Sequence, residues 1–265
     1  MQTVIKKPRY GNWVSNTLIR RFMVLFLVFV VPDAALWTFV PGWFPLKVLL
    51  ALPAALCLVC VGYFVRSRWL FAAEGGGVQN KVLDELISRV EWDGCGRVLD
   101  IGCGSGALSI RLAKKYKDAA ITGIDYWGGG WEYSRKQCEE NARLEGVGGR
   151  THFQQASASK LPFEDEAFDL VVSNLTFHEV KDSENKLDVL KEALRVVKKG
   201  GQFVFQDLFL IRQYYGTPDK LTAAVKAMGV KKVYFVDTSK ASFIPRALKL
   251  PFMIGALGLI YGERE

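Results

Sequence analysis

The sequence contains few cysteines, and they are not arranged as a disulfide framework. Five cysteines in 265 residues form an odd, dispersed set, and no pairing pattern stands out. Cys57 and Cys60 do form a C-x-x-C, but they lie in an apolar run without polar neighbours to stabilise a thiolate. We interpret this pair as apolar packing residues, and we expect no metal site.

Acidic residues are absent from residues 1–21, and runs of basic residues interleaved with aromatics are absent from the rest of the chain. The second absence argues against nucleic acid as a partner, although the net charge is +8. Basic residues instead flank the apolar segments, a pattern typical of the cytoplasmic side of a membrane and of contact with anionic lipids. They are Lys6, Lys7, Arg9, Arg20, Arg21, Arg66 and Arg68. There is no internal repeat or low-complexity segment.

Long hydrophobic runs are concentrated near the N-terminus, at residues 22–40 and 46–65. As a helix, the first run would rise ~28 Å, close to the ~30 Å hydrocarbon core of a bilayer. Asp33 within it costs ~3 kcal/mol on an insertion scale, while the run's Leu, Phe and Val residues return about 4–7 kcal/mol. We therefore expect a transmembrane helical hairpin with both ends in the cytoplasm.

Three other interpretations of these runs remain open. A basic start followed by residues 22–31 also fits a signal peptide, although no cleavage pattern stands out. A buried hairpin of a soluble protein would need a polar helix face. Pro32 and Pro53 could kink the segments into a loop that enters one leaflet. On the transmembrane interpretation the organisation is a basic cytoplasmic N-terminus (1–21), a hairpin (22–65), a linker (66–77) and a cytoplasmic catalytic domain (78–265), with membrane lipids as partners.

Strand and helix patterns alternate after residue 78, which indicates a mainly parallel sheet covered by helices on both faces. Helices are expected at 78–90, 107–116, 131–145, 183–198 and 221–229, and strands at 97–102, 119–125, 150–157, 168–174, 202–209, 231–238 and 253–264. Gly200-Gly201 is interpreted as a helix stop signal. The last two strands should form an antiparallel pair, although residues 243–261 could instead form an interfacial amphipathic stretch.

A glycine-rich turn carries the strongest chemical signal: Asp100-Ile101-Gly102-Cys103-Gly104-Ser105-Gly106 follows a buried strand and opens a helix. Its glycines also fit a dinucleotide-binding turn. However, Asp100 would repel a pyrophosphate, whereas it would attract a ligand carrying an amine and a sulfonium. Asp125 ends the next strand, where an acid can accept both hydroxyls of a ribose; it could also cap the following helix.

Four blocks in order resemble the class I S-adenosylmethionine-dependent methyltransferases, in particular methyltransferase type 11: VLDIGCGSG, GID, LPFEDEAFDLVVSN and LKEALRVVKKGGQFVF. The resemblance covers about residues 78–210. It implies a Rossmann-like α/β fold with a seven-stranded sheet, here preceded by two transmembrane helices, and S-adenosylmethionine as the methyl donor.

The resemblance also implies roles for single residues in binding the cofactor. Asp100 and Gly102 would lie near the methionine part, and Asp125 would hold the ribose. Tyr126 would flank the adenine. The remaining turn residues, which would shape the pocket, are Cys103, Gly104 and Gly106.

Ser157-Ala158 stands where the family usually has Asp-Ala, and that Asp contacts the adenine amino group. Ser157 could accept the same hydrogen bond without charge. Asn174 and His178 follow the fourth strand, close to the transferred methyl in related enzymes, and are the candidate catalytic residues; Asn174 is also a cofactor candidate. His178 could be a general base or could simply bond to backbone.

Residues 126–133 hold three glycines among four aromatics, which suggests a lid over the cofactor or a loop packed on the next helix. Taken together, the sequence predicts a membrane-anchored methyltransferase acting on a small or lipid-like hydrophobic acceptor. A membrane-associated NAD(P)-dependent reductase and a non-catalytic methyltransferase-like binding protein are the alternatives.

Overall fold

The computed structural model describes residues 6–128 and 133–265. The chain forms two compact units. One comprises the residues up to Gly11 together with Lys81–Glu265, and the other comprises Asn12–Asn80. The chain therefore leaves the first unit after Gly11 and re-enters it at Lys81, after the expected hairpin and linker.

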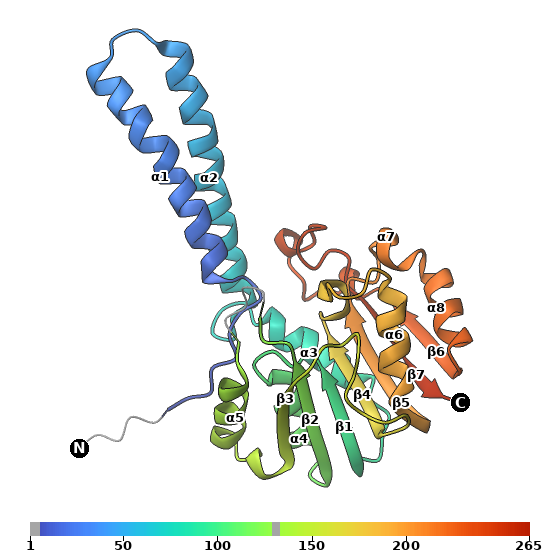
Figure 1. Cartoon of the computed structure of the whole chain (residues 1–265). Coiled ribbons are helices and arrows are strands. Elements are labelled where there is room, and N and C mark those ends of the chain that lie inside the picture. Colours follow the sequence, from blue (N-terminus) through green and yellow to red (C-terminus); the bar gives the residue numbers. More distant parts are fainter. Residues whose placement is uncertain (1–5, 129–132) are drawn as a thin grey trace, which may run out of the picture. The chain divides into compact units, whose positions relative to one another are not determined.

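The second unit is dominated by two long antiparallel helices, α1 (Asn16–Phe39) and α2 (Phe44–Phe71) (Figure 1). Both are longer than the predicted apolar runs, and α2 includes the first part of the predicted linker. Ser15 caps α1 by accepting a hydrogen bond from the backbone N–H of Leu18. Pro32 and Pro53 lie inside the two helices.

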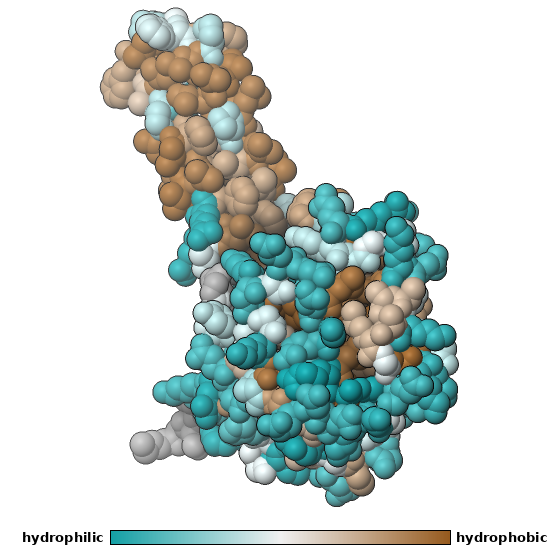
Figure 2. Space-filling model, turned by 45° about the vertical axis from the view of Figure 1, so that its right-hand side comes forward, coloured by the Kyte–Doolittle hydropathy of each residue, from teal (hydrophilic) through white to brown (hydrophobic). Residues whose placement is uncertain are grey.

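Apolar side chains make up most of the visible surface of these two helices (Figure 2). No residue of α1 is buried, so an interpretation of α1 as the core helix of a soluble domain has no support in the described residues. By length and composition, both helices could cross a membrane.

The first unit contains a seven-stranded sheet in the order β3-β2-β1-β4-β5-β7-β6. Strands β1 to β5 are parallel, and β7 runs antiparallel to both β5 and β6. The bounds are β1 (Gly96–Ile101), β2 (Ala119–Asp125), β3 (Thr151–Gln155), β4 (Phe168–Asn174), β5 (Val197–Asp207), β6 (Val230–Val236) and β7 (Gly258–Arg264). The predicted Rossmann-like sheet and its terminal antiparallel pair are confirmed.

Helices cover both faces of the sheet because successive strand residues point in opposite directions. Along β1, Val98 packs in one buried cluster while Leu99 and Ile101 pack in the other. The Val98 cluster contains residues of α3 (Val78–Ser88), α4 (Ala107–Lys115) and α5 (Arg135–Leu144). The opposite cluster contains residues of α6 (Lys186–Arg195) and α8 (Pro218–Ala227).

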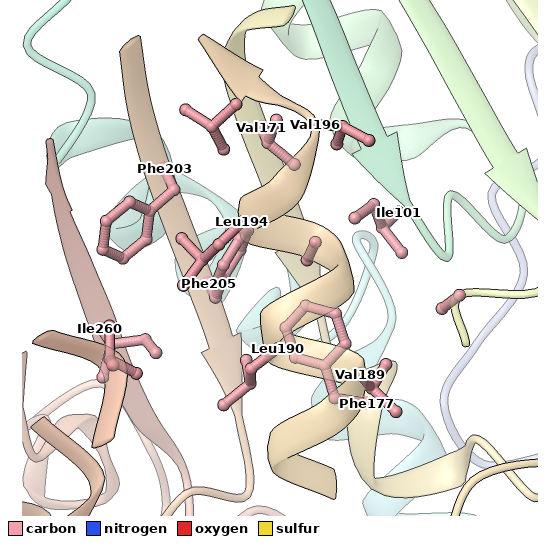
Figure 3. Close-up of a cluster of buried hydrophobic side chains, with 14 of the residues drawn as sticks. Ile101, Val171, Phe177, Val189, Leu190, Leu194, Val196, Phe203, Phe205 and Ile260 are labelled. Carbon is pink, nitrogen blue, oxygen red and sulfur yellow. The ribbon is translucent and has the colours of Figure 1, made fainter. Parts of the chain in front are cut away.

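In this second cluster, Leu190 and Leu194 of α6 approach Phe203 and Phe205 of β5 (Figure 3). Phe177 reaches the same layer from the loop after β4, and its ring meets that of Phe205 edge-on, with centroids 5.1 Å apart. Burial of large apolar side chains is the main stabilising contribution to such a layer. This packing also fixes where the residues directly after Phe177 lie.

The interpretation of Gly200-Gly201 as a helix stop was wrong. Helix α6 already ends at Arg195, and the glycine pair lies inside β5, which begins at Val197. Because Val197 is fully buried and pairs with Phe168, the strand starts before the glycines. The register then shifts, and Gly200 (φ 71°) provides the irregularity.

Several short elements were not predicted. They are α7 (Arg212–Tyr215) and the 3-10 helices η1 (Gly148–Arg150), η2 (Phe177–Glu179), η3 (Thr238–Lys240) and η4 (Arg246–Leu248). The last two belong to the connection between β6 and β7. Of residues 243–261, the alternative interfacial stretch, the final part forms β7.

Candidate functional site

The glycine-rich turn between β1 and α4 has the backbone geometry of a ligand cradle. Gly102, Gly104 and Gly106 all have left-handed φ angles, of 75°, 56° and 82°, which glycine adopts without strain. A Cβ on Gly102 would overlap the side chain of Thr176, which follows β4. The turn therefore lies tightly against the β4 end of the sheet because residue 102 has no side chain.

Asp125, at the end of β2, bridges this turn. One carboxylate oxygen accepts the backbone N–H of Gly104 at 2.8 Å, and the other accepts that of Trp127 at 2.7 Å. Trp127 in turn donates its indole N–H to the carbonyl of Gly104 at 2.8 Å. Asp125 thus organises the backbone on both sides of the site. The alternative that Asp125 caps the following helix was wrong, because Ser134 caps α5. The predicted ribose contact stays a prediction.

Asp100 lies beneath the turn and is 1% exposed. It accepts a hydrogen bond of 2.5 Å from the hydroxyl of Ser109 on α4. Burial raises the pKa of Asp100 to about 7, with a contribution from the charge of Asp125, although the Ser109 bonds act in the opposite direction. Near neutral pH, a cation bound above Asp100 would stabilise its ionised carboxylate, as expected for a sulfonium or ammonium group.

Cys103 and Tyr126 differ in what they can offer a ligand. The Cys103 side chain is 6% exposed, packs near Cys138, and has its thiol pKa raised mainly by burial. Only its backbone can contribute to the turn, where its N–H donates to the carbonyl of Ile124 at 2.9 Å. Tyr126 is 68% exposed at the tip of β2 and is free to cover a flat group. Of the predicted lid, residues 129–132 lie outside the described residues.

Ser157 occupies the position where the methyltransferase family usually has Asp, and a carboxylate lies next to it. Its hydroxyl and that of Ser159 each donate to one carboxylate oxygen of Asp182, both at 2.6 Å. These bonds are the main reason why the pKa of Asp182 lies below its ordinary value. Sequence reasoning missed Asp182, because it follows Ser157 by 25 positions with nothing in the sequence to link them. Ala158, next to Ser157, is buried in the core.

Asn174 ends β4 next to the turn, and its side-chain oxygen is buried without a hydrogen-bond partner among the described residues. The paired position on β5 is Gln206, which is fully buried and whose side-chain oxygen likewise lacks a partner in the described part of the chain. Leaving such groups unsatisfied costs ~1–3 kcal/mol each. Asn174 at the end of β4 and Gln206, one residue before the end of β5, therefore offer acceptors suited to a ligand's N–H or O–H groups.

His178 pairs with Asp207, a residue that the sequence analysis missed. His178 Nδ1 lies 2.5 Å from Asp207 Oδ1, and the His178 backbone N–H donates to Asp207 Oδ2 at 3.2 Å. Asp207 ends β5 and is fully buried, while the His178 side chain is 18% exposed. The available signal was positional, because β4 and β5 are adjacent parallel strands whose carboxyl ends meet at one edge.

The charge on His178 reflects opposing effects. Burial lowers its pKa, but the charge of Asp207 and the hydrogen bond to it, with help from Glu179, raise the pKa above its ordinary value, while Lys186 acts against them. A histidine with Nδ1 held by a carboxylate presents Nε2 as a proton acceptor. Neither predicted alternative described this pairing, since the imidazole bonds to a carboxylate and not to backbone.

Comparison with known proteins agrees with this geometry. A family model described as a methyltransferase domain matches residues 99–205. A malonyl-[acyl-carrier protein] O-methyltransferase from Geobacter sulfurreducens is 36% identical over 133 residues, covering 48% of this chain and 45% of that protein. A ubiquinone/menaquinone biosynthesis C-methyltransferase from Desulfotalea psychrophila is 34% identical over 122 residues, covering 46% and 45%. The chain thus spans about half the length of these relatives.

Among solved structures, the fold is similar to that of a geranyl diphosphate C-methyltransferase from Streptomyces coelicolor, determined with Mg²⁺, geranyl diphosphate and S-adenosyl-L-homocysteine. The TM-score is 0.53 at 15% sequence identity, and the match covers 73% of this chain and 82% of that one. At this identity the likeness concerns the fold.

Proposed function

We propose that this chain is a class I S-adenosylmethionine-dependent methyltransferase, with S-adenosylmethionine as the cofactor. In this proposal it methylates a small or lipid-like hydrophobic acceptor while anchored to a membrane by α1 and α2. The observation that carries this proposal is the left-handed three-glycine turn braced by Asp125 at the carboxyl edge of the sheet. This edge is where open α/β sheets bind their ligands.

The residues at this edge fit the cofactor. A Cβ on Gly102 would overlap Thr176, so the glycine lets the turn lie against the carboxyl end of β4, beside the other residues of the site. Asp100 is placed to favour the cationic methionine end, and the orphan oxygen of Asn174 would accept an N–H from the amino group. Bound there, the cofactor supplies an electrophilic methyl group on a positively charged sulfur.

Asp125 is proposed to hold the ribose and Tyr126 to cover the adenine. We assign recognition of the adenine amino group to Ser157 and Asp182 acting together. The two hydroxyls that bond to Asp182 hold its carboxylate beside Ser157. The pair would restore the acceptor charge that Ser157 by itself lacks, and this arrangement would explain how a serine is tolerated at that position.

His178 is proposed as the general base for an acceptor hydroxyl. Asp207 holds Nδ1 and stabilises the imidazolium that forms when Nε2 takes the proton. The phenol of Tyr215 is buried near Asp207 and lacks a hydrogen-bond partner among the described residues. Gln206 and Tyr215 are therefore further candidates for contact with the acceptor.

Two lines of support favour a hydrophobic acceptor. The similar proteins are named for malonyl-[acyl-carrier protein], quinone and geranyl diphosphate substrates. Independently, α1 and α2 have the length and composition to cross a bilayer, which would keep the cytoplasmic sheet unit at the surface where lipid-soluble acceptors accumulate. The basic residues that flank the helices suit anionic lipid head groups.

Calorimetric titration of the full chain in lipid nanodiscs tests the assignment. Heat is expected with S-adenosyl-L-homocysteine and none with NADH, and changing Asp125 to Ala should weaken the first interaction strongly. Binding without transfer of labelled methyl to any extracted lipid or metabolite would favour the non-catalytic alternative. Heat with NADH alone would contradict the proposal.

A further inference from the structure

The residues that precede the first apolar helix lie on the sheet unit as an extended segment. We call residues 6–11 the strap. From the sequence these residues were expected to belong to a basic N-terminus that faces lipid. In the structure they belong to the same compact unit as the cofactor turn.

One buried side chain of α5, that of Asn141, binds the backbone of the strap. Asn141, 2% exposed, accepts the N–H of Arg9 at 2.8 Å and donates to the carbonyl of Arg9 at 2.9 Å. The same amide group also donates to the carbonyl of Ser105, in the glycine-rich turn, at 3.0 Å. Asn141 thus joins the strap and the turn in one hydrogen-bond network.

A second bond joins the strap to the turn directly. The Ser105 hydroxyl, on a residue that is 5% exposed, donates to the carbonyl of Tyr10 at 2.6 Å. Tyr10 is itself held, since its phenol donates to Glu145, the C-cap residue of α5, at 3.0 Å. Both backbone groups of Arg9 and the carbonyl of Tyr10 are therefore satisfied by Asn141 of α5 and by Ser105 of the glycine-rich turn.

The strap also approaches the turn through an aromatic ring. Gly11 has φ 70°, and a Cβ there would overlap the ring of Tyr133. The same ring lies 3.4 Å from where a Cβ of Gly104 would be. Tyr133 therefore packs against both the strap and the turn. Lys6, with an ion pair of 2.7 Å to Glu140, secures the far end.

We propose that the strap is part of the cofactor site, with Asn141 as the positioning residue that holds the glycine-rich turn in its binding geometry. This proposal rests on the proposed function. A turn with three left-handed glycines has many accessible conformations when free. Contacts that restrict it before binding reduce the conformational entropy lost on binding, and so raise affinity. The sheet unit then requires residues that come before the apolar helices in the sequence as well as those that come after them.

The test uses the full chain in nanodiscs with S-adenosyl-L-homocysteine as the probe. Asn141→Ala removes the bonds to both backbone groups of Arg9 and to Ser105, and should weaken binding by about tenfold or more. With a hydroxyl acceptor, KM for S-adenosylmethionine should rise more than kcat falls. Lys136→Ala is the matched control, because Lys136 is exposed on the same helix as Asn141 and lies outside the strap, and its change should leave affinity unaltered.

A second variant guards against simple unfolding, because Asn141 is buried. Replacing residues 6–11 by a Gly/Ser segment of equal length removes no fully buried side chain. It removes the Tyr10 and Lys6 contacts that hold the strap in place, and should weaken binding similarly. Hydrogen exchange should show slower exchange in residues 6–11 when the probe is bound.

If both variants bind as tightly as the wild type, or if they lose melting temperature but not affinity, the strap has no part in the cofactor site. The same holds if the probe leaves exchange in residues 6–11 unchanged. A wild-type chain that does not bind the probe would overturn the proposed function as well, so the two failures are distinguishable.

Discussion

At the scale of single residues, the His178–Asp207 pair makes the most direct prediction. As a general base, His178 must be neutral, and Asp207 raises its pKa above the ordinary value. Transfer to a hydroxyl acceptor should therefore increase as the pH rises through that raised pKa. Asp207→Asn removes the charge but keeps the shape, so the midpoint of the kcat/KM profile should move to lower pH.

The rate is the second measurement on this pair. General bases typically contribute about 10²–10⁴-fold, so His178→Ala should lower kcat by that order. Glu179→Gln is a suitable control, because Glu179 lies 3.9 Å from His178 Nε2 and is more exposed. Full activity in the His178 variant would remove the base role and would point to an acceptor that needs no deprotonation.

The stability effect of the same pair has the opposite dependence on pH. A histidine whose pKa is raised on folding contributes stability that is present below its unfolded value of about 6.5 and is lost as pH rises through the folded value. Thermal melts of the wild type and of Asp207→Asn should therefore differ more at pH 6 than at pH 9. Asp207 also accepts the N–H of Leu208 at 2.6 Å, so a constant offset is expected throughout.

Ser157 and Asp182 give a prediction about the cofactor base. Asp182→Asn should weaken binding of S-adenosyl-L-homocysteine by about tenfold, as expected for loss of a charged hydrogen-bond acceptor. Ser157→Asp in the same background should recover part of the loss, because it places a carboxylate at the family's usual position. Competition with a nucleoside that lacks the adenine amino group is the control, since its affinity should not respond to Asp182.

At the scale of elements, the turn between β1 and α4 limits what position 102 can hold. Gly102→Ala meets two costs: a left-handed φ, at roughly 1–2 kcal/mol for an L-residue, and overlap with Thr176. Gly146, with φ 74° and open space around its Cβ position, is the matched control that pays only the first cost. Thermal melts should show a larger loss for Gly102→Ala than for Gly146→Ala.

The overlap can be tested separately from the backbone strain. Adding Thr176→Ala to Gly102→Ala removes the side-chain atoms that a new Cβ would meet, so part of the lost stability should return. Equal melting temperatures for the Gly102 and Gly146 variants would show that the β1 turn can move away from the β4 end without cost. The close fit of the cradle would then not be a requirement of the fold.

At the scale of the whole molecule, the two apolar helices and the strap make separable contributions. Replacing residues 12–72 by a flexible linker keeps the strap and should move the protein from the membrane pellet to the soluble fraction with its affinity for S-adenosyl-L-homocysteine preserved. Deleting residues 1–72 should also release the protein but with weaker binding. If the first variant still pellets with membranes, α1 and α2 are not its sole attachment.

The sequence determined the fold because its signals are local. Strand and helix periodicity, the glycines before α4 and the acids at the ends of β1 and β2 each lie within a few residues of one another, and their physical meaning is independent of distant contacts. Asp100, Asp125, Asn174 and His178 could all be placed at one edge of the sheet, since parallel strands bring their carboxyl ends together.

Only the tertiary structure decided which residues complete the site. Asp207 beside His178, Asp182 beside Ser157, and the strap beside Ser105 are separated by 29, 25 and 95 positions in the chain. No local pattern encodes such pairings, because they depend on how strands are ordered and where loops return. Gly200-Gly201 shows the converse, since burial and pairing of Val197 overrode a local stop signal.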